Sequence, residues 1–236
     1  MIITNERIGQ QEIEKKIDEY TQKSFSNMLE ICRYFSHSGE SFERSERGRW
    51  TNNEGKFTTK DSFCGFACLN MILYSQFSLK DLDTVDFIRN GLKQEDMWVA
   101  RKGIRWNGLM EYGLKILSEN GFNNILGIIY NFNENKNLFI LHGSEISFIK
   151  KSIKDGIPLI AGVPRYLNRQ RHASHLIIIH GYDEESDQFI ITDPDNEAMK
   201  RLTRHNPIRQ NNTIAISVKD WEYIFSGIAM RFILDV

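Results

Sequence analysis

The pattern of hydrophobic residues changes halfway along the chain, and this change constrains the fold more than any other feature. In the first half, apolar side chains recur at helical spacing over 64–74, 107–120 and 144–155. Gly121 and Gly156 follow the last two segments, where a left-handed cap commonly ends a helix. The second half instead contains short β-branched or aromatic runs between turn residues: 157–163, 175–182, 188–192, 213–218 and 228–234. Helices followed by strands predict an α+β domain with an antiparallel sheet.

The N-terminal segment has a different character from the rest of the chain. Residues 11–35 carry apolar side chains at helical spacing, whereas 37–55 is rich in Ser, Gly, Arg, Glu and Asn and shows little periodicity. We therefore predict a helical extension and linker over 1–50 and one domain over 51–236. A hydrophobic content of 41% is enough for that domain to bury a sizeable core.

Charge and cysteine usage exclude several classes of function. Lys and Arg number 30 against 31 Asp and Glu, so no global basic field favours a nucleic-acid partner. Apolar runs such as 176–179 are far shorter than a membrane span, and no signal peptide opens the chain, so we expect a cytoplasmic protein. The 3 cysteines describe neither a disulfide framework nor a four-ligand zinc site. Neither a phosphate loop nor dinucleotide-binding glycines are present, and we expect no metal and no cofactor.

Cys64 is the first candidate catalytic residue. It follows the polar stretch 58–62 and begins a helical run, a position where free N–H groups stabilise a thiolate and later an oxyanion. Gly65 is expected to leave room for a substrate to approach the sulfur. The alternative is a buried cysteine that packs as a small hydrophobic residue, which is what we expect of Cys68 one turn further on.

A thiolate needs a base and a group that orients the base, and the second half of the chain offers both. His175 opens one predicted strand, and Asp193 ends the next strand, which the acidic loop 183–187 joins to the first as a hairpin. His180 lies five positions along and therefore on the opposite face of its strand. A structural histidine at a strand edge and an ordinary Asp-Pro turn are the alternatives for the two residues. Together with Cys64, they have the composition of a catalytic triad.

Three sequence blocks, at 64–71, 174–183 and 190–194, contain these residues. They resemble the bacteriocin-processing, double-glycine-type cysteine peptidases and their stand-alone relatives, which are papain-like enzymes. In that family a Cys-Gly-x-Ala sequence starts a helix, a His precedes a Gly-Tyr/Phe-Asp turn, and an Asp-Pro ends the next strand. The resemblance extends more weakly over 57–234. It implies a papain-like fold with a helical lobe packed on an antiparallel sheet, and peptide hydrolysis through a thioester on the cysteine.

The chain departs from this family at one position. The family usually has a Gln six residues before the nucleophile, where its amide helps form the oxyanion hole, but position 58 is Thr. We expect Thr58 or Lys60 to replace that donor, with Thr59 and Asn53 as further candidates and the Cys64 backbone N–H as the second donor. A lost oxyanion donor typically costs about two to three orders of magnitude in rate. The site is therefore either rebuilt or impaired.

Function is expected to follow from this site in one of three ways. The first is hydrolysis of a peptide or amide bond, and the second is transfer of the acyl group to an amine or thiol, as in an acyltransferase or peptide-modifying enzyme. The third is a papain-like module that binds a peptide without turnover. The substrate is a peptide or a small acyl or amide compound, and Trp106 is expected to line its cleft, with core packing as the alternative. The sequence leaves the oligomeric state open.

Overall fold

The computed structural model describes residues 64–79, 87, 90, 91, 94, 98, 99, 103–132, 143–164, 175–194, 208–210 and 213–234. The helices of this part are α2 (Cys64–Phe77), α4 (Trp106–Glu119), α5 (Gly143–Lys154) and α7 (Val218–Ile224). A small sheet pairs β1 (Trp98–Val99) with β2 (Gly103–Ile104). The main sheet contains β3 (Ile125–Asn131), β4 (Leu159–Val163), β5 (His175–Asp183), β6 (Gln188–Thr192), β7 (Ile208–Gln210), β8 (Thr213–Ser217) and β9 (Ile228–Leu234). Residues 1–50 lie outside the described part, so the domain boundary at residue 50 stays a prediction.

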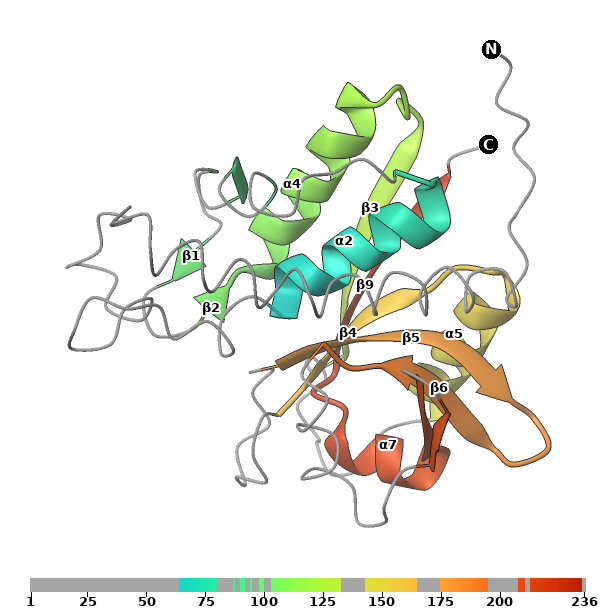
Figure 1. The fold of residues 1–236 in the computed structure, drawn as a ribbon. Coiled ribbons are helices and arrows are strands. Elements are labelled where there is room, and N and C mark those ends of the chain that lie inside the picture. Colours follow the sequence, from blue (N-terminus) through green and yellow to red (C-terminus); the bar gives the residue numbers. More distant parts are fainter. Residues whose placement is uncertain are drawn as a thin grey trace.

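The main sheet is antiparallel throughout and is covered by helices on both faces. Its seven strands lie in the order β3-β9-β4-β5-β6-β8-β7. Helices α2 and α4 cover one face, and α5 and α7 cover the other (Figure 1). The predicted α+β class, with helices packed on an antiparallel sheet, is confirmed. In the described residues, no helix combines the length and the apolar character that crossing a bilayer requires.

Strand β5 lies in the middle of the sheet and is buried on both faces. Leu176 and Ile178 belong to the core under α2, whereas Ile177 and Ile179 belong to the core against α5 and α7. This division follows from the alternation of side chains along a strand. Full burial of one such side chain contributes about 1.5–3 kcal/mol to stability. A strand covered on both faces needs apolar residues at every position, which explains the unbroken Leu-Ile-Ile-Ile run.

Two predicted helix ends match the structure, whereas other element boundaries differ from the predictions. Gly121 and Gly156 have φ values of +90° and +72°, so both predicted helix caps are confirmed. Strand β3 was not predicted, because the first half was expected to be mainly helical; it pairs with β9 along its whole length. The predicted strand 213–218 ends one residue early. The Ser217 hydroxyl accepts the Asp220 N–H at 3.1 Å and caps α7 instead.

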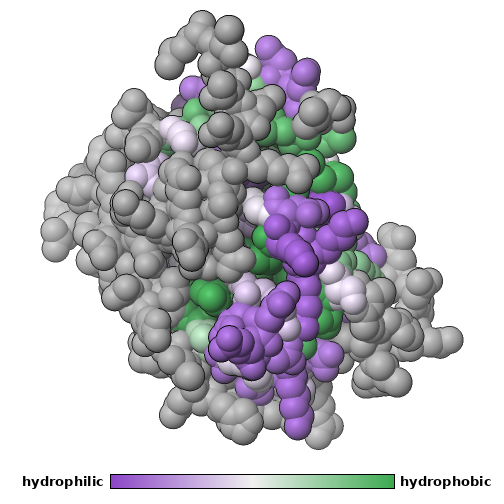
Figure 2. Space-filling model, turned by 90° about the vertical axis from the view of Figure 1, so that its right-hand side faces the viewer, coloured by the Kyte–Doolittle hydropathy of each residue, from purple (hydrophilic) through white to green (hydrophobic). Residues whose placement is uncertain are grey.

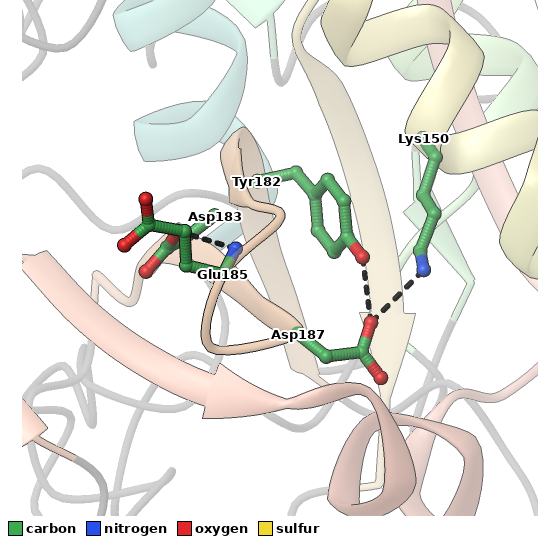
Figure 3. Close-up of polar contacts among 5 residues, drawn as sticks. All are labelled: Lys150, Tyr182, Asp183, Glu185 and Asp187. Atoms are coloured by element: carbon green, nitrogen blue, oxygen red, sulfur yellow. Dashed lines mark hydrogen bonds and ion pairs between the residues drawn. The ribbon is translucent and has the colours of Figure 1, made fainter.

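The predicted hairpin between β5 and β6 is confirmed, and a group of polar contacts stabilises its turn. The Asp187 carboxylate accepts hydrogen bonds from the Tyr182 hydroxyl at 2.6 Å and from the Lys150 ammonium at 3.0 Å (Figure 3). Lys150 also lies 4.3 Å from the centre of the Tyr182 ring. We call these three residues the turn cluster. Figure 2 shows the side of the molecule to which this turn projects, and hydrophilic side chains dominate its described surface.

Candidate active site

Cys64 is the first residue of α2, and close packing fixes the start of this helix against the sheet. A side chain added at Gly65 would meet Leu176 at 3.2 Å, Ile104 at 3.3 Å and Leu109 at 3.5 Å. The glycine therefore allows the start of α2 to approach β5, β2 and α4 closely. This differs from the expectation that Gly65 makes room for substrate, because protein side chains occupy the space beside it.

The environment of Cys64 favours the thiolate. Burial raises the pKa of its thiol, but a hydrogen bond and the charge of His175, together with the N–H groups of Leu176 and Gly65, lower it more. The net effect is a pKa below the ordinary value of 9.0. The residue as a whole is still partly exposed to solvent. A lowered pKa in a partly exposed residue is typical of a reactive cysteine.

His175 lies between Cys64 and Asp193. Its Nε2 is 2.6 Å from Asp193 Oδ1, and both residues are buried, with 3% and 1% of their surface exposed. Burial lowers the pKa of His175, but the hydrogen bonds to Asp193 and Cys64 and their charges raise it to about 10. Because Asp193 occupies Nε2, Nδ1 is the nitrogen left to exchange a proton with the thiol.

The antiparallel pairing of β5 and β6 explains why the histidine and the carboxylate meet. His175 begins β5, and Asp193 follows the last residue of β6, so both lie at the same end of the hairpin. Pro194 comes next and has no N–H with which to continue the ladder. The structure thus brings together all three residues of the candidate triad: Cys64, His175 and Asp193.

The remaining predicted site residues have different outcomes. Trp106 is the first residue of α4 and is partly buried, packed against the core under α2. Thr58 and Lys60 lie outside the described residues, so their proposed contribution to the oxyanion hole stays a prediction. Within the described ranges, no three His, Cys, Asp or Glu side chains cluster in a way that would hold a metal ion.

His180 is a second buried histidine of β5, and it is separate from the candidate triad. It sits at the register shift between Ile179 and Gly181, where β5 bulges relative to β6. Its Nε2 lies 3.1 Å from the Thr192 hydroxyl, and burial lowers the pKa of its ring to about 3. The His180 ring is therefore neutral at pH 7, and it is part of the buried interior of the domain.

Sequence reasoning did not identify the backbone of Leu176 as part of the site. Its N–H contacts the Cys64 sulfur, while its carbonyl accepts a hydrogen bond from the Cys68 thiol at 3.3 Å. Cys68 itself is fully buried, as predicted. Every residue except proline carries a backbone N–H, so the residue type gives no signal for this role. The only indication in the sequence is that Leu176 directly follows the candidate base.

Chemically, this arrangement joins a nucleophile, a base and an orienting carboxylate. An imidazolium with a raised pKa beside a thiol with a lowered pKa favours the thiolate–imidazolium pair. The thiolate can attack an electrophilic carbon, and the imidazolium can protonate a leaving group. Such a site suits acyl transfer.

Two solved structures share low sequence identity with this chain. One solved structure is described as the crystal structure of a double glycine motif protease from AMS/PCAT transporter in complex with the leader peptide. It is 16% identical, covers 72% of this chain and 82% of its own, and has a TM-score of 0.41. The peptidase domain of Streptococcus mutans ComA is 15% identical, covers 73% and 92%, and has a TM-score of 0.35. A search of curated protein sequences found no match.

Family assignment comes from the sequence profile. The profile described as Peptidase_C39 like family matches residues 47–224, which is most of the chain and includes all three residues of the candidate triad. The chain therefore belongs to the Peptidase C39-like family.

Proposed function

We propose that the protein is a cysteine peptidase that cleaves a peptide or amide bond through a thioester on Cys64. The observation that carries this proposal is the contact of the Cys64 thiol with a histidine whose other nitrogen lies 2.6 Å from a buried carboxylate. A structural cysteine needs neither a lowered pKa nor a base. Membership of a peptidase family supports a peptide as the substrate.

In the first half of the proposed reaction, the Cys64 thiolate attacks the carbonyl carbon of the scissile bond. The carbonyl oxygen becomes an oxyanion, which the backbone N–H groups at the start of α2 would stabilise. As the oxyanion collapses, the carbon–nitrogen bond breaks and His175 gives its proton to the leaving amine. The products of this half are the amine and a thioester between Cys64 and the acyl part.

In the second half, His175 is neutral and acts as a base. It takes a proton from a water molecule, whose oxygen attacks the thioester carbon, and the carbon–sulfur bond then breaks. Cys64 leaves as a thiolate, and the proton stays on His175, which restores the starting ion pair. Asp193 accepts a hydrogen bond from Nε2 throughout and so keeps the ring in one tautomer and orientation.

The direct test is cleavage of a diverse pool of synthetic peptides in water enriched in oxygen-18, followed by mass spectrometry. Hydrolysis would place one heavy oxygen on each new carboxyl end. We expect products with the unmodified protein and none with Cys64→Ala or His175→Ala. Asp187→Asn, which removes a carboxylate from the turn cluster, is the matched control and should cleave normally.

A second arm of the test separates hydrolysis from acyl transfer. Added hydroxylamine should capture part of the thioester as a hydroxamate, and the fraction captured reports how readily a nitrogen acceptor replaces water. The proposal fails if no peptide is cut and a peptide carrying a thiol-reactive vinyl sulfone also leaves Cys64 unlabelled. Labelling without turnover would instead support a module that binds a peptide.

A further inference from the structure

The backbone of Leu176 contacts both cysteine sulfurs of α2. Its N–H hydrogen bonds to Cys64, the candidate nucleophile, and its carbonyl oxygen accepts from the Cys68 thiol at 3.3 Å. Cys64 and Cys68 are one helical turn apart, so their side chains lie on the same face of α2. The two thiols therefore bind the two backbone groups of the same residue.

The end of the β5–β6 ladder makes these backbone groups available. The last pair joins Ile178 to Thr192, and continuing the same register by two residues would place Leu176 opposite Pro194. Proline has no N–H and cannot form that pair. A buried backbone N–H and carbonyl still need partners, because leaving either unpaired costs free energy. The first turn of α2 supplies both partners through sulfur atoms.

Strand pairing and side-chain packing also fix the position of Leu176. On the other side of β5 it pairs with Gly162 of β4, and its side chain packs against the position where a Gly65 side chain would lie. The residue is buried, with 8% of its surface exposed. The contact of Cys68 with Leu176 depends on a polar side chain outside the candidate triad, so it can be changed without altering the nucleophile.

We infer that Leu176 is a catalytic residue through its backbone N–H, and that Cys68 is a positioning residue that keeps this N–H directed at the Cys64 sulfur. The inference rests on the proposed function, since it assigns further roles in the same site. A thiol is a weak donor, but a buried carbonyl has no water to replace it. If the Cys68 thiol is removed, the Leu176 carbonyl loses its hydrogen-bond donor, and the backbone at Leu176 can shift so that its N–H no longer points at the nucleophile.

The contact itself can be tested in the unmodified protein by NMR of a sample labelled with nitrogen-15 leucine. Leu176→Ile would identify the amide signal of Leu176 by removing it. We expect this signal to shift as Cys64 ionises, and to stop titrating in Cys64→Ser. An amide signal that does not respond to the ionisation of Cys64 would overturn the inference, whatever any Cys68 variant does.

The positioning role is tested by the pH profile of Cys64 alkylation, with each thiol resolved by peptide mass spectrometry. At pH 6 we expect Cys68→Ala to slow labelling of Cys64 by roughly three- to tenfold, the range of one modest hydrogen bond. Cys68→Ser, whose hydroxyl can still donate to the carbonyl, should restore most of the rate. An unchanged profile in Cys68→Ala would overturn the positioning role.

A matched control comes from the same helix. The Ser75 hydroxyl donates to the Met71 carbonyl at 2.6 Å and is fully buried, and it lies near the other end of α2 from Cys64. Ser75→Ala should therefore lower stability while leaving the Cys64 profile unchanged. These readouts do not depend on peptide cleavage. Normal Leu176 and Cys64 behaviour without cleavage would count against the proposed function alone, whereas cleavage with a silent Leu176 amide would count against this inference alone.

Discussion

The two ends of the β5–β6 hairpin use similar chemical groups in opposite environments. At one end, Asp193 contacts His175 in the interior, and at the other, Asp187 contacts Lys150 at the surface. The distances are similar, 2.6 and 3.0 Å, but the side chains of the second pair are 60% and 33% exposed. Water screens the surface pair and cannot reach the buried pair. Both carboxylates raise the pKa of their partner, but the large change is at the buried pair, so burial matters more than contact distance for the size of the effect.

The largest expected difference between the two ends is in catalysis. Asp193→Asn should reduce peptide cleavage by roughly 10²- to 10⁴-fold, because the His175 ring loses the partner that fixes its tautomer. Asp187→Asn makes the same chemical change at the exposed end and should alter the rate by less than about twofold. The measurement is kcat/KM for one peptide with both variants. Similar losses in the two variants would show that the comparison is wrong.

Stability should separate the two ends next. Asp193→Ala leaves a buried histidine without its carboxylate and should lower the free energy of unfolding by about 3–5 kcal/mol. Asp187→Ala removes an exposed partner and should cost less than about 1 kcal/mol. Urea unfolding at pH 7 measures both values. A smaller cost for Asp193→Ala than for Asp187→Ala would mean that the buried pair contributes nothing beyond packing.

The pH dependence of Cys64 reactivity sharpens the description of the buried end. The pKa of the Cys64 thiol is lowered from 9.0, and the pKa of His175 is about 10. The ion pair therefore exists at pH values above the lowered thiol pKa and below about 10. Cleavage should rise as pH passes the thiol pKa and fall as pH rises through about 10, where His175 loses the proton needed by the leaving amine. In His175→Ala, alkylation of Cys64 at pH 7 should slow by about tenfold or more. An unchanged alkylation rate in that variant would exclude the ion pair.

The smallest expected effects belong to the turn cluster. Hydrogen bonds from Tyr182 and Lys150 and the charge of Lys150 hold the pKa of Asp187 below its ordinary value. A carboxylate with a lowered pKa stabilises the fold above its unfolded pKa of about 3.8, and this contribution is lost as pH falls through the folded value. With Asp187→Asn, the free energy of unfolding should therefore depend slightly less on pH between about pH 3 and pH 7. We expect the difference to be less than about 0.5 kcal/mol in 0.5 M salt. Thermal unfolding from pH 3 to pH 7 measures this, and a large slope change would show that the cluster is not screened.

The sequence was most informative where structure depends on neighbouring residues. Gly121 and Gly156 mark helix ends through their own backbone conformation, and the run after His175 reflects a strand buried on both faces. Strand β3 was not predicted because its partner β9 comes about a hundred residues later in the chain. The local hydrophobic periodicity of the sequence does not indicate such a long-range pairing. Val218 has the β-branched side chain typical of a strand and so belongs to the predicted strand 213–218, but in the structure it is the first residue of α7, after the Ser217 cap.

The candidate site shows the same limit. Cys64, His175 and Asp193 could be selected from their types and from their places at the start of a helix and at strand ends. Their contact, however, depends on how α2 packs against β5, which is a tertiary property. The Leu176 N–H could not be selected, because a backbone donor leaves no mark in the sequence. Thr58 and Lys60 stay predictions, and so do the catalytic roles of the candidate triad.

The central position of β5 has a consequence for the order of events during synthesis. Cys68 and Leu176 are 108 residues apart, and Asp193 comes later still. A nascent chain exposes Cys64 long before the residues that activate it have left the ribosome, and until β5 inserts between β4 and β6 that cysteine is an ordinary thiol. Unfinished or misfolded copies therefore lack the contacts that lower the pKa of Cys64, and a reactive thiol requires both layers of the domain to be assembled.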